Sequence, residues 1–443
     1  MRLAALLLAA APALADAPAV ESLATPEGRE MLHVEMPGAG YSQLSLFWPG
    51  TAALGAPGRE GLFVLGARLP FERAGGRGFD EIDEALLDAG EAVFLVNRLH
   101  GTILVLQAAE GPFEASVEIA RDVLGDAALA EDDLDYLKRG IEDGLAQSER
   151  DAGLMAERAS GALVAGGDRR LSALTNRPFE TVAAVEVAEI RAWTEETFHD
   201  APLIVSAGPL DAEAAGAAAD AVLDGLPEPS GEPGTPEPVT FAGAGTTVAI
   251  PAPEIDVAVV TMPFLLPSYS AAGGVAFAAL GGPDGRLFRR VREEMGASYG
   301  LGVNVTPLTP DRQLVALAGA VEPSRAGEVV AIMREEVARL REEGPTQVEI
   351  DAALAEQLAS FEAAFTDPDQ ATGYLLDRLA LGLVPDLDAV AEPSRTLTLE
   401  EAAAAIPDLL VEDPPAVIVT PDPDAAEADC VLDVPEEAAD CAG

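Results

Sequence analysis

The fold is decided by residues 130–166, "AEDDLDYLKRGIEDGLAQSERDAGLMAERASGALVAG", because the same order of predicted elements occurs again later in the chain. Residues 346–382 read "TQVEIDAALAEQLASFEAAFTDPDQATGYLLDRLALG". Each stretch has a capped acidic start, a long amphipathic helix, a break and a second helix. A repeat on this scale indicates a duplicated domain and not a short-period solenoid.

The segments around both stretches also follow one order, and the 443 residues suit two domains of about 200 each. We predict an α+β fold of two tandem homologous domains, each a mixed, mostly antiparallel sheet packed with helices. Strands are predicted at 29–36, 41–48, 92–99, 101–109 and 202–208 in the first half, and at 246–251, 257–263, 298–305 and 312–321 in the second.

Proline and glycine dominate the stretch between the halves, "GLPEPSGEPGTPEPVTFAGAG". Such a composition is typical of a linker and does not suit a packed element. We therefore predict domains at 16–226 and 246–424, joined by a linker at 227–245 and followed by a tail at 425–443.

The start of the chain, residues 1–15, has the form of a secretory signal peptide. Leu3 to Ala11 are too few to span a bilayer, and Ala13-Leu14-Ala15 fits a cleavage site. A retained anchor is the alternative, although the apolar run ends at once. The most apolar later stretch, residues 257–282, is broken by prolines and glycines and predicts no transmembrane anchor. We expect export to the periplasm.

Cys430 and Cys441 are the two cysteines of the chain and lie close together in the tail. In an oxidising compartment such a pair predicts a disulfide. No histidine lies nearby, and two thiolates make half of a zinc site, so we expect no metal there.

The formal net charge of −49 excludes nucleic acid as a partner, because phosphates would be repelled. Two interpretations of the acidity stay open. It gives either a highly solvated surface, as in salt-adapted proteins, or an inner wall that attracts basic peptides.

The three histidines, His33, His100 and His199, include no pair at i,i+4 spacing. Two histidines one helical turn apart are what a helical zinc site needs. We expect each of the three to make local hydrogen bonds instead of binding a metal.

The segment "GGPDGRLFRRVREEMGASYG", residues 281–300, predicts a helix, a terminating glycine and a strand. Arg292 lies beside the apolar stripe of that helix, and Tyr299 follows the turn. From the residues alone, Arg292 is a surface residue and Tyr299 is a core tyrosine.

This segment and the duplicated halves resemble the pitrilysin/insulinase family of zinc metallopeptidases over nearly all of residues 28–424. The resemblance implies that the two domains form half of a clamshell. Active members carry H-x-x-E-H on a helix that corresponds here to "GREGLFVLGARL". The corresponding slots hold Val64, Ala67 and Arg68, and the slot of the third ligand falls near Asp135 or Leu137. These residues predict no zinc in this chain.

The resemblance also implies a role for Arg292 and Tyr299. In active members an arginine and a tyrosine at this spacing come from the second half and face the zinc. The chain is then similar to the non-catalytic subunit of two-subunit processing peptidases, which binds peptides and completes the site of a zinc-bearing, H-x-x-E-H partner. An inert peptide-binding or assembly protein of the same fold is the alternative. The natural substrate, the partner's identity and the choice between homodimer and heterodimer stay open.

Overall fold

The computed structural model describes residues 19–50, 60–98, 101–148, 150–165, 181–229, 245–268, 270–296, 301–309, 312–380, 382 and 387–441. The predicted signal segment and most of the predicted linker lie outside these residues. Within them, no helix is both long and apolar enough to cross a membrane.

The first half contains one large sheet, a short hairpin and several helices. Its strands are β1 (Val20–Ala24), β2 (Glu30–Glu35), β3 (Ser42–Pro49), β4 (Arg73–Ala74), β5 (Arg77–Gly78), β6 (Glu91–Arg98), β7 (Gly101–Ala108) and β8 (Leu203–Gly208). Its helices are α1 (Glu60–Gly66), α2 (Leu69–Glu72), α3 (Phe79–Ala89), α4 (Glu114–Gly125), α5 (Glu131–Ser148), α6 (Ala152–Ala165), α8 (Val187–Thr197) and α9 (Ala212–Leu223).

The second half is built in the same way. Its strands are β9 (Thr247–Pro251), β10 (Ala258–Pro267), β11 (Gly302–Thr309), β12 (Arg312–Val321), β13 (Ala416–Thr420) and β14 (Cys430–Val431). Its helical segments are α10 (Ala271–Gly281), η3 (Phe288–Glu294), η4 (Pro323–Arg325), α11 (Ala326–Glu343), α12 (Gln347–Ala364), α13 (Pro368–Ala380), α14 (Leu387–Thr396), α15 (Leu399–Leu409), η5 (Pro423–Ala426) and η6 (Pro435–Cys441).

The two six-stranded sheets share the topology of five strands and differ in the strand at one edge. The first has the order β1-β2-β8-β3-β7-β6, and the second, counted from its other edge, has the order β14-β9-β13-β10-β12-β11. The first sheet has one parallel pair, β2 with β8, among antiparallel pairs. The second has the equivalent parallel pair, β9 with β13, and a further parallel pair at its edge, β14 with β9. The predicted α+β fold of two homologous, mostly antiparallel sheets is confirmed.

The central strands of each sheet are buried on both faces. On β3, Leu44, Leu46 and Trp48 join the core under the helices of the first half, whereas Phe47 points into a different core. Side chains alternate across a strand, so a strand that is apolar at nearly every position needs cover on both faces.

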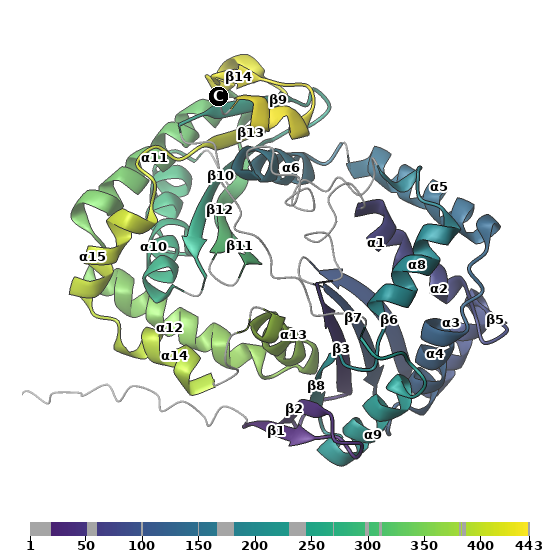
Figure 1. The fold of residues 1–443 in the computed structure, drawn as a ribbon. Coiled ribbons are helices and arrows are strands. Elements are labelled where there is room, and N and C mark those ends of the chain that lie inside the picture. Colours follow the sequence, from purple (N-terminus) through teal and green to yellow (C-terminus); the bar gives the residue numbers. More distant parts are fainter. Residues whose placement is uncertain are drawn as a thin grey trace, which may run out of the picture.

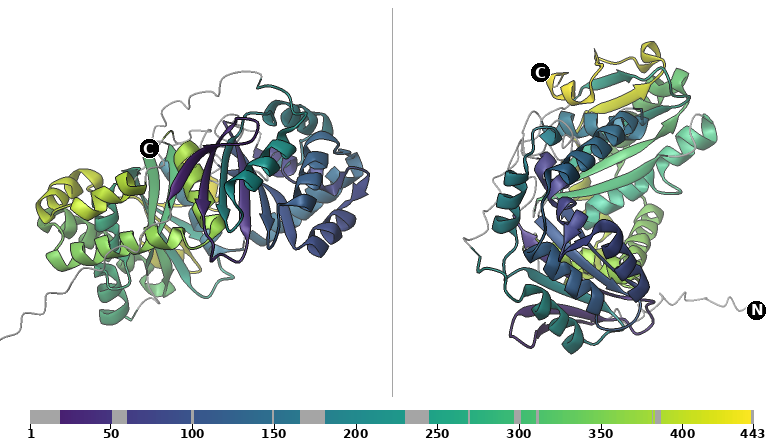
Figure 2. Two further views of the ribbon diagram at one scale, coloured as in Figure 1. Left: turned by 90° about the horizontal axis from the view of Figure 1, so that it is seen from below. Right: turned by 90° about the vertical axis from the view of Figure 1, so that its right-hand side faces the viewer.

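The second cover comes from the other half of the chain. α13 packs on β3 and β8 of the first sheet, and α6 packs on β10 and β13 of the second. Leu375 and Leu376 of α13 lie in the core that contains Phe47, and Met155 and Leu163 of α6 lie in a core of the second sheet. Figure 1 shows α6 beside the second sheet and α13 beside the first, and the views of Figure 2 show the halves meeting there.

The tail fastens α6 to the second sheet. β14 pairs with β9 in parallel, and η6 packs against α6. A disulfide of 2.01 Å joins Cys430 to Cys441, and Cys441 also contacts the core around α6. The Arg158 guanidinium of α6 forms a buried ion pair with the Glu436 carboxylate of η6.

Candidate functional site

The helix that would hold zinc in an active peptidase corresponds to α1. Val64 lies on this helix, and Ala67 and Arg68 follow it in the turn before α2. Val64 and Ala67 pack against the core of the first half, and Arg68 is exposed. None of these side chains offers a neutral imidazole nitrogen, a thiolate or a carboxylate, so they do not fit a zinc ion.

The predicted slots for a third ligand lie on α5 and do not change this. Asp135 is exposed and Leu137 is buried in the core of the first half. Across the described ranges, no group of three or more His, Cys, Asp or Glu side chains could hold a metal ion.

The described histidines are held by hydrogen bonds. The Nδ1 atom of His33 lies 2.8 Å from the Oγ atom of Ser206, and that of His199 accepts from the backbone N–H of Ala201 at 3.2 Å. Burial lowers the pKa of both rings, so neither is poised to carry a charge near neutral pH. His100 lies outside the described residues.

Arg292 lies on η3, which is a π-helix and not the α-helix that periodicity suggests. The Met295 N–H donates to the Arg290 carbonyl, five residues earlier, at 3.3 Å. Gly296 ends the turn with a φ of 66°, the left-handed conformation predicted for it. π-turns are uncommon and are found frequently at functional sites.

A buried arginine anchors the start of η3 to α12. Arg286 donates from Nε and Nη2 to the Glu349 carboxylate at 2.8 and 3.0 Å, and from Nη2 to the Gly344 carbonyl at 3.0 Å. Burial acts to raise the pKa of Glu349, but the hydrogen bonds from Arg286 and Thr346 outweigh it and bring the pKa to about 2. The carboxylate therefore stays charged, and the ion pair stays intact, at neutral pH.

The far end of η3 is held as well. Arg325 donates from Nη1 to the Met295 carbonyl at 2.9 Å, and Arg290 donates to the buried Glu336 carboxylate at 2.9 Å. Leu287 and Val291 are buried in the core of the second half. η3 is thus a rigid support from which a side chain can project.

Arg292 is exposed on this support, and its Cζ atom lies 4.9 Å from the centre of the Phe288 ring. Stacking on an aromatic face orients a guanidinium and leaves its N–H groups free to point outward. Tyr299, the other predicted site residue, lies outside the described residues. The next described residue, Leu301, is buried.

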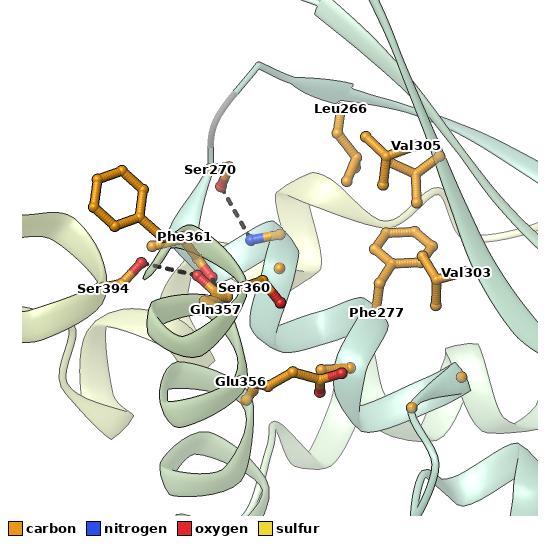
Figure 3. Close-up of a pocket in the computed structure, with 18 of the residues that line it drawn as sticks. Leu266, Ser270, Phe277, Val303, Val305, Glu356, Gln357, Ser360, Phe361 and Ser394 are labelled. Atoms are coloured by element: carbon orange, nitrogen blue, oxygen red, sulfur yellow. Dashed lines mark hydrogen bonds between the residues drawn. The ribbon is translucent and has the colours of Figure 1, made fainter. Parts of the chain in front are cut away.

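A pocket of about 1010 Å³ opens next to this region. Figure 3 shows it between α10, α12 and the second sheet, with Phe277, Leu266 and Val305 on one side and Phe361 on the other. Phe288 and Leu301 also line it. Residues that flank Arg292 and Tyr299 in sequence are therefore part of the pocket wall.

Polar groups are few in the pocket. Gln357 accepts a hydrogen bond from the Ser394 hydroxyl at 2.9 Å and donates to the Ala271 carbonyl at 3.4 Å. Glu356 is the charged residue among those that line the pocket in the described part of the chain. The sequence analysis missed Glu356, Gln357 and Ser394, because α12 and α14 meet only in the folded chain. The glycines of α10 were the one sequence signal for this region, because glycines within a helix can indicate close packing of neighbouring elements.

The comparisons with known proteins point to one family. Residues 185–357 match the family described as Peptidase M16 inactive domain. An uncharacterized zinc protease of Streptomyces coelicolor is 25% identical over 322 residues, which are 69% of this chain and 69% of that protein.

Solved structures have the same fold. A peptidase M16 inactive domain from Pseudomonas fluorescens matches with a TM-score of 0.78 and 19% identity, over 91% of this chain and 98% of that one. The periplasmic protease PqqL from Escherichia coli matches with a TM-score of 0.70 and 15% identity, over 95% of this chain. This chain spans 48% of PqqL.

Proposed function

We propose that this chain is the non-catalytic subunit of a two-subunit zinc peptidase, because residues 185–357 match the Peptidase M16 inactive domain and α1 lacks zinc ligands. The match to this family model and the zinc-protease relative support the resemblance to the pitrilysin/insulinase family that the sequence shows. In the proposed complex, a homologous subunit carries H-x-x-E-H and zinc, and this chain supplies Arg292 and Tyr299. Its acidic inner wall and edge strands hold the peptide.

The observation that carries the proposal is the contrast between α1 and η3. The zinc slots on α1 hold Val64, Ala67 and Arg68, whereas η3 presents Arg292 from a support that is anchored at both ends. We therefore assign the function to η3 with Arg292, and not to α1.

The two side chains would act as hydrogen-bond donors. The Tyr299 hydroxyl donates to the oxyanion that forms when water attacks the peptide carbonyl, and the Arg292 guanidinium donates to backbone carbonyls of the substrate. Preorganised donors of this kind contribute about 3 kcal/mol each to the stabilisation of a transition state.

Export to the periplasm is part of the proposal. Residues 1–15 have the pattern of a signal peptide, and the similar PqqL protein is described as periplasmic. The Cys430–Cys441 disulfide suits an oxidising compartment.

Co-purification from the native periplasm tests the proposal. We expect a homologous H-x-x-E-H subunit in the purified complex, with zinc and cleavage of a fluorogenic peptide present in the complex and absent from this chain alone. A zinc-free, inactive complex would favour the second candidate, an inert peptide-binding or assembly protein, which the match to an inactive domain also supports. Chelator-resistant cleavage by the chain alone would contradict both.

A further inference from the structure

The pocket beside η3 is a large, partly open hollow. Its volume of about 1010 Å³ lies at the upper end of the range of about 300–1,000 Å³ that is typical of ligand sites. Its described wall is mostly apolar, with Phe277, Val303 and Phe361 among the larger side chains.

Glycines on α10 allow α12 and the second sheet to approach this helix closely. A Cβ atom at Gly274 would lie 2.7 Å from Nε2 of Gln357, and one at Gly281 would lie 2.7 Å from Cδ2 of Leu317. α10 therefore contributes backbone at its glycines and the Phe277 ring to this side of the pocket.

The charge of the pocket is set by Glu356. Gln357 already bonds to Ser394 and to the Ala271 carbonyl, so its amide is largely satisfied. Glu356 is exposed and forms no ion pair with another residue that the structure describes. An apolar cavity with one unpaired carboxylate is complementary to an apolar group next to a cation.

The position of the pocket connects it to the proposed site. Phe288 lines the pocket, and Arg292 stacks on the ring of the same residue. Leu301, two residues after Tyr299, is also in the wall. Arg292 therefore lies next to the pocket wall, through its contact with Phe288.

We propose that this pocket holds an apolar side chain of the bound peptide, and that Glu356 binds a lysine or arginine beside it. The inference rests on the proposed function, because it takes a peptide as the ligand. It adds a specificity pocket within the second half of this chain. The pocket then selects peptides by a pair of residues, one apolar and one basic.

The test is binding of labelled peptides to the purified full chain, without partner or zinc. The probes are a fluorescein-labelled hexapeptide, Ala-Ala-Phe-Arg-Ala-Ala, and versions with Phe replaced by Ala or Arg replaced by Gln. Ser360→Trp fills the pocket from an exposed position on α12, and Ala359→Trp is its matched control outside the pocket. Glu356→Gln removes the charge, and Glu342→Gln on α11 is the control for charge alone.

We expect Ser360→Trp to weaken binding of the Phe-Arg peptide about tenfold and to abolish the preference for Phe. Glu356→Gln should weaken it about threefold and leave the Arg-to-Gln peptide unaffected. Wild-type affinity in both variants, or displacement by laurate with no preference for Phe, would overturn the inference. Because no partner is present, that result would leave a Tyr299-dependent cleavage by the complex untouched.

Discussion

α6 packs on the second sheet, and α13 packs on the first sheet in an equivalent way. The polar contacts that hold the two helices in place differ. α6 is held by a covalently closed tail and by the buried ion pair of Arg158 with Glu436. α13 is held by hydrogen bonds, since Gln43 donates to the Thr372 hydroxyl at 2.6 Å and to Asp369 at 3.1 Å. The duplication repeats the packing, whereas the polar contacts around it have diverged.

The anchors of the long helices differ in the same way. Asp133 of α5 and Glu349 of α12 occupy equivalent positions of the repeated stretches, and each pairs with an arginine. The side chain of Arg73, the partner of Asp133, is 48% exposed, whereas that of Arg286 is 9% exposed. The better-anchored helix is the one that supports η3, so the repeat has been reinforced next to the proposed site.

The largest expected effect tests whether α6 and α13, each of which packs on the sheet of the other half, contribute equally to stability. Leu163 of α6 and Leu375 of α13 are both fully buried. Leu163→Ala and Leu375→Ala should each lower the free energy of unfolding by about 3 kcal/mol, because each leaves a cavity between the halves. Denaturant unfolding measures both. A large loss of stability in one variant and none in the other would show that only one of the two helices holds the halves together.

The next effect separates the fastenings. A Cys430→Ser/Cys441→Ser variant should lose about 2 kcal/mol of stability, because the open tail gains conformational freedom when unfolded. Hydrogen exchange should rise in α6, on which the tail packs, and stay unchanged in α13, which has no such tie. Equal protection of α6 in the oxidised and variant proteins would contradict the fastening role of the tail.

The third effect concerns the two anchors. Glu349→Gln should lower stability at pH 7 by about 2 kcal/mol, and Asp133→Asn by clearly less, because solvent screens the exposed Arg73. The folded pKa of Glu349, about 2, lies below its ordinary value. Its contribution is thus complete above about pH 4.5 and is lost as the pH falls towards 2.

Thermal unfolding of the wild type and Glu349→Gln between pH 2 and 7 measures this contribution. The difference in stability between the two proteins should shrink as the pH falls through that window. A difference that is constant across the window would mean that the Arg286 pair does not stabilise the fold.

Much of the fold could be predicted from the sequence because its signals are local. The repeated stretches, the alternation of apolar residues and Gly296 indicated the duplicated α+β halves and the end of η3. The exchange of α6 and α13 could not be predicted, because an amphipathic helix does not show which half supplies its partner. The contacts of Arg286 and Arg325 that hold η3 at its two ends join residues distant in sequence, so the sequence does not show them.

The candidate site could also be predicted only in part. The loss of zinc ligands needed only the residue types at Val64, Ala67 and Arg68. The exposed position of Arg292 also follows from helical periodicity. The pocket did not, because its wall joins α10, α12, α14 and the second sheet.

The most direct test of the central claim is the cleavage rate of the assembled two-subunit complex with Tyr299→Phe in this chain. Removing the hydroxyl should reduce kcat about a hundredfold while zinc content, assembly and KM stay close to wild type, because the donor acts in the transition state. Arg289→Gln on the same helical segment should leave the rate unchanged, whereas Arg292→Gln should reduce it. A Tyr299→Phe complex that cleaves as fast as wild type would contradict the claim that this chain completes its partner's active site.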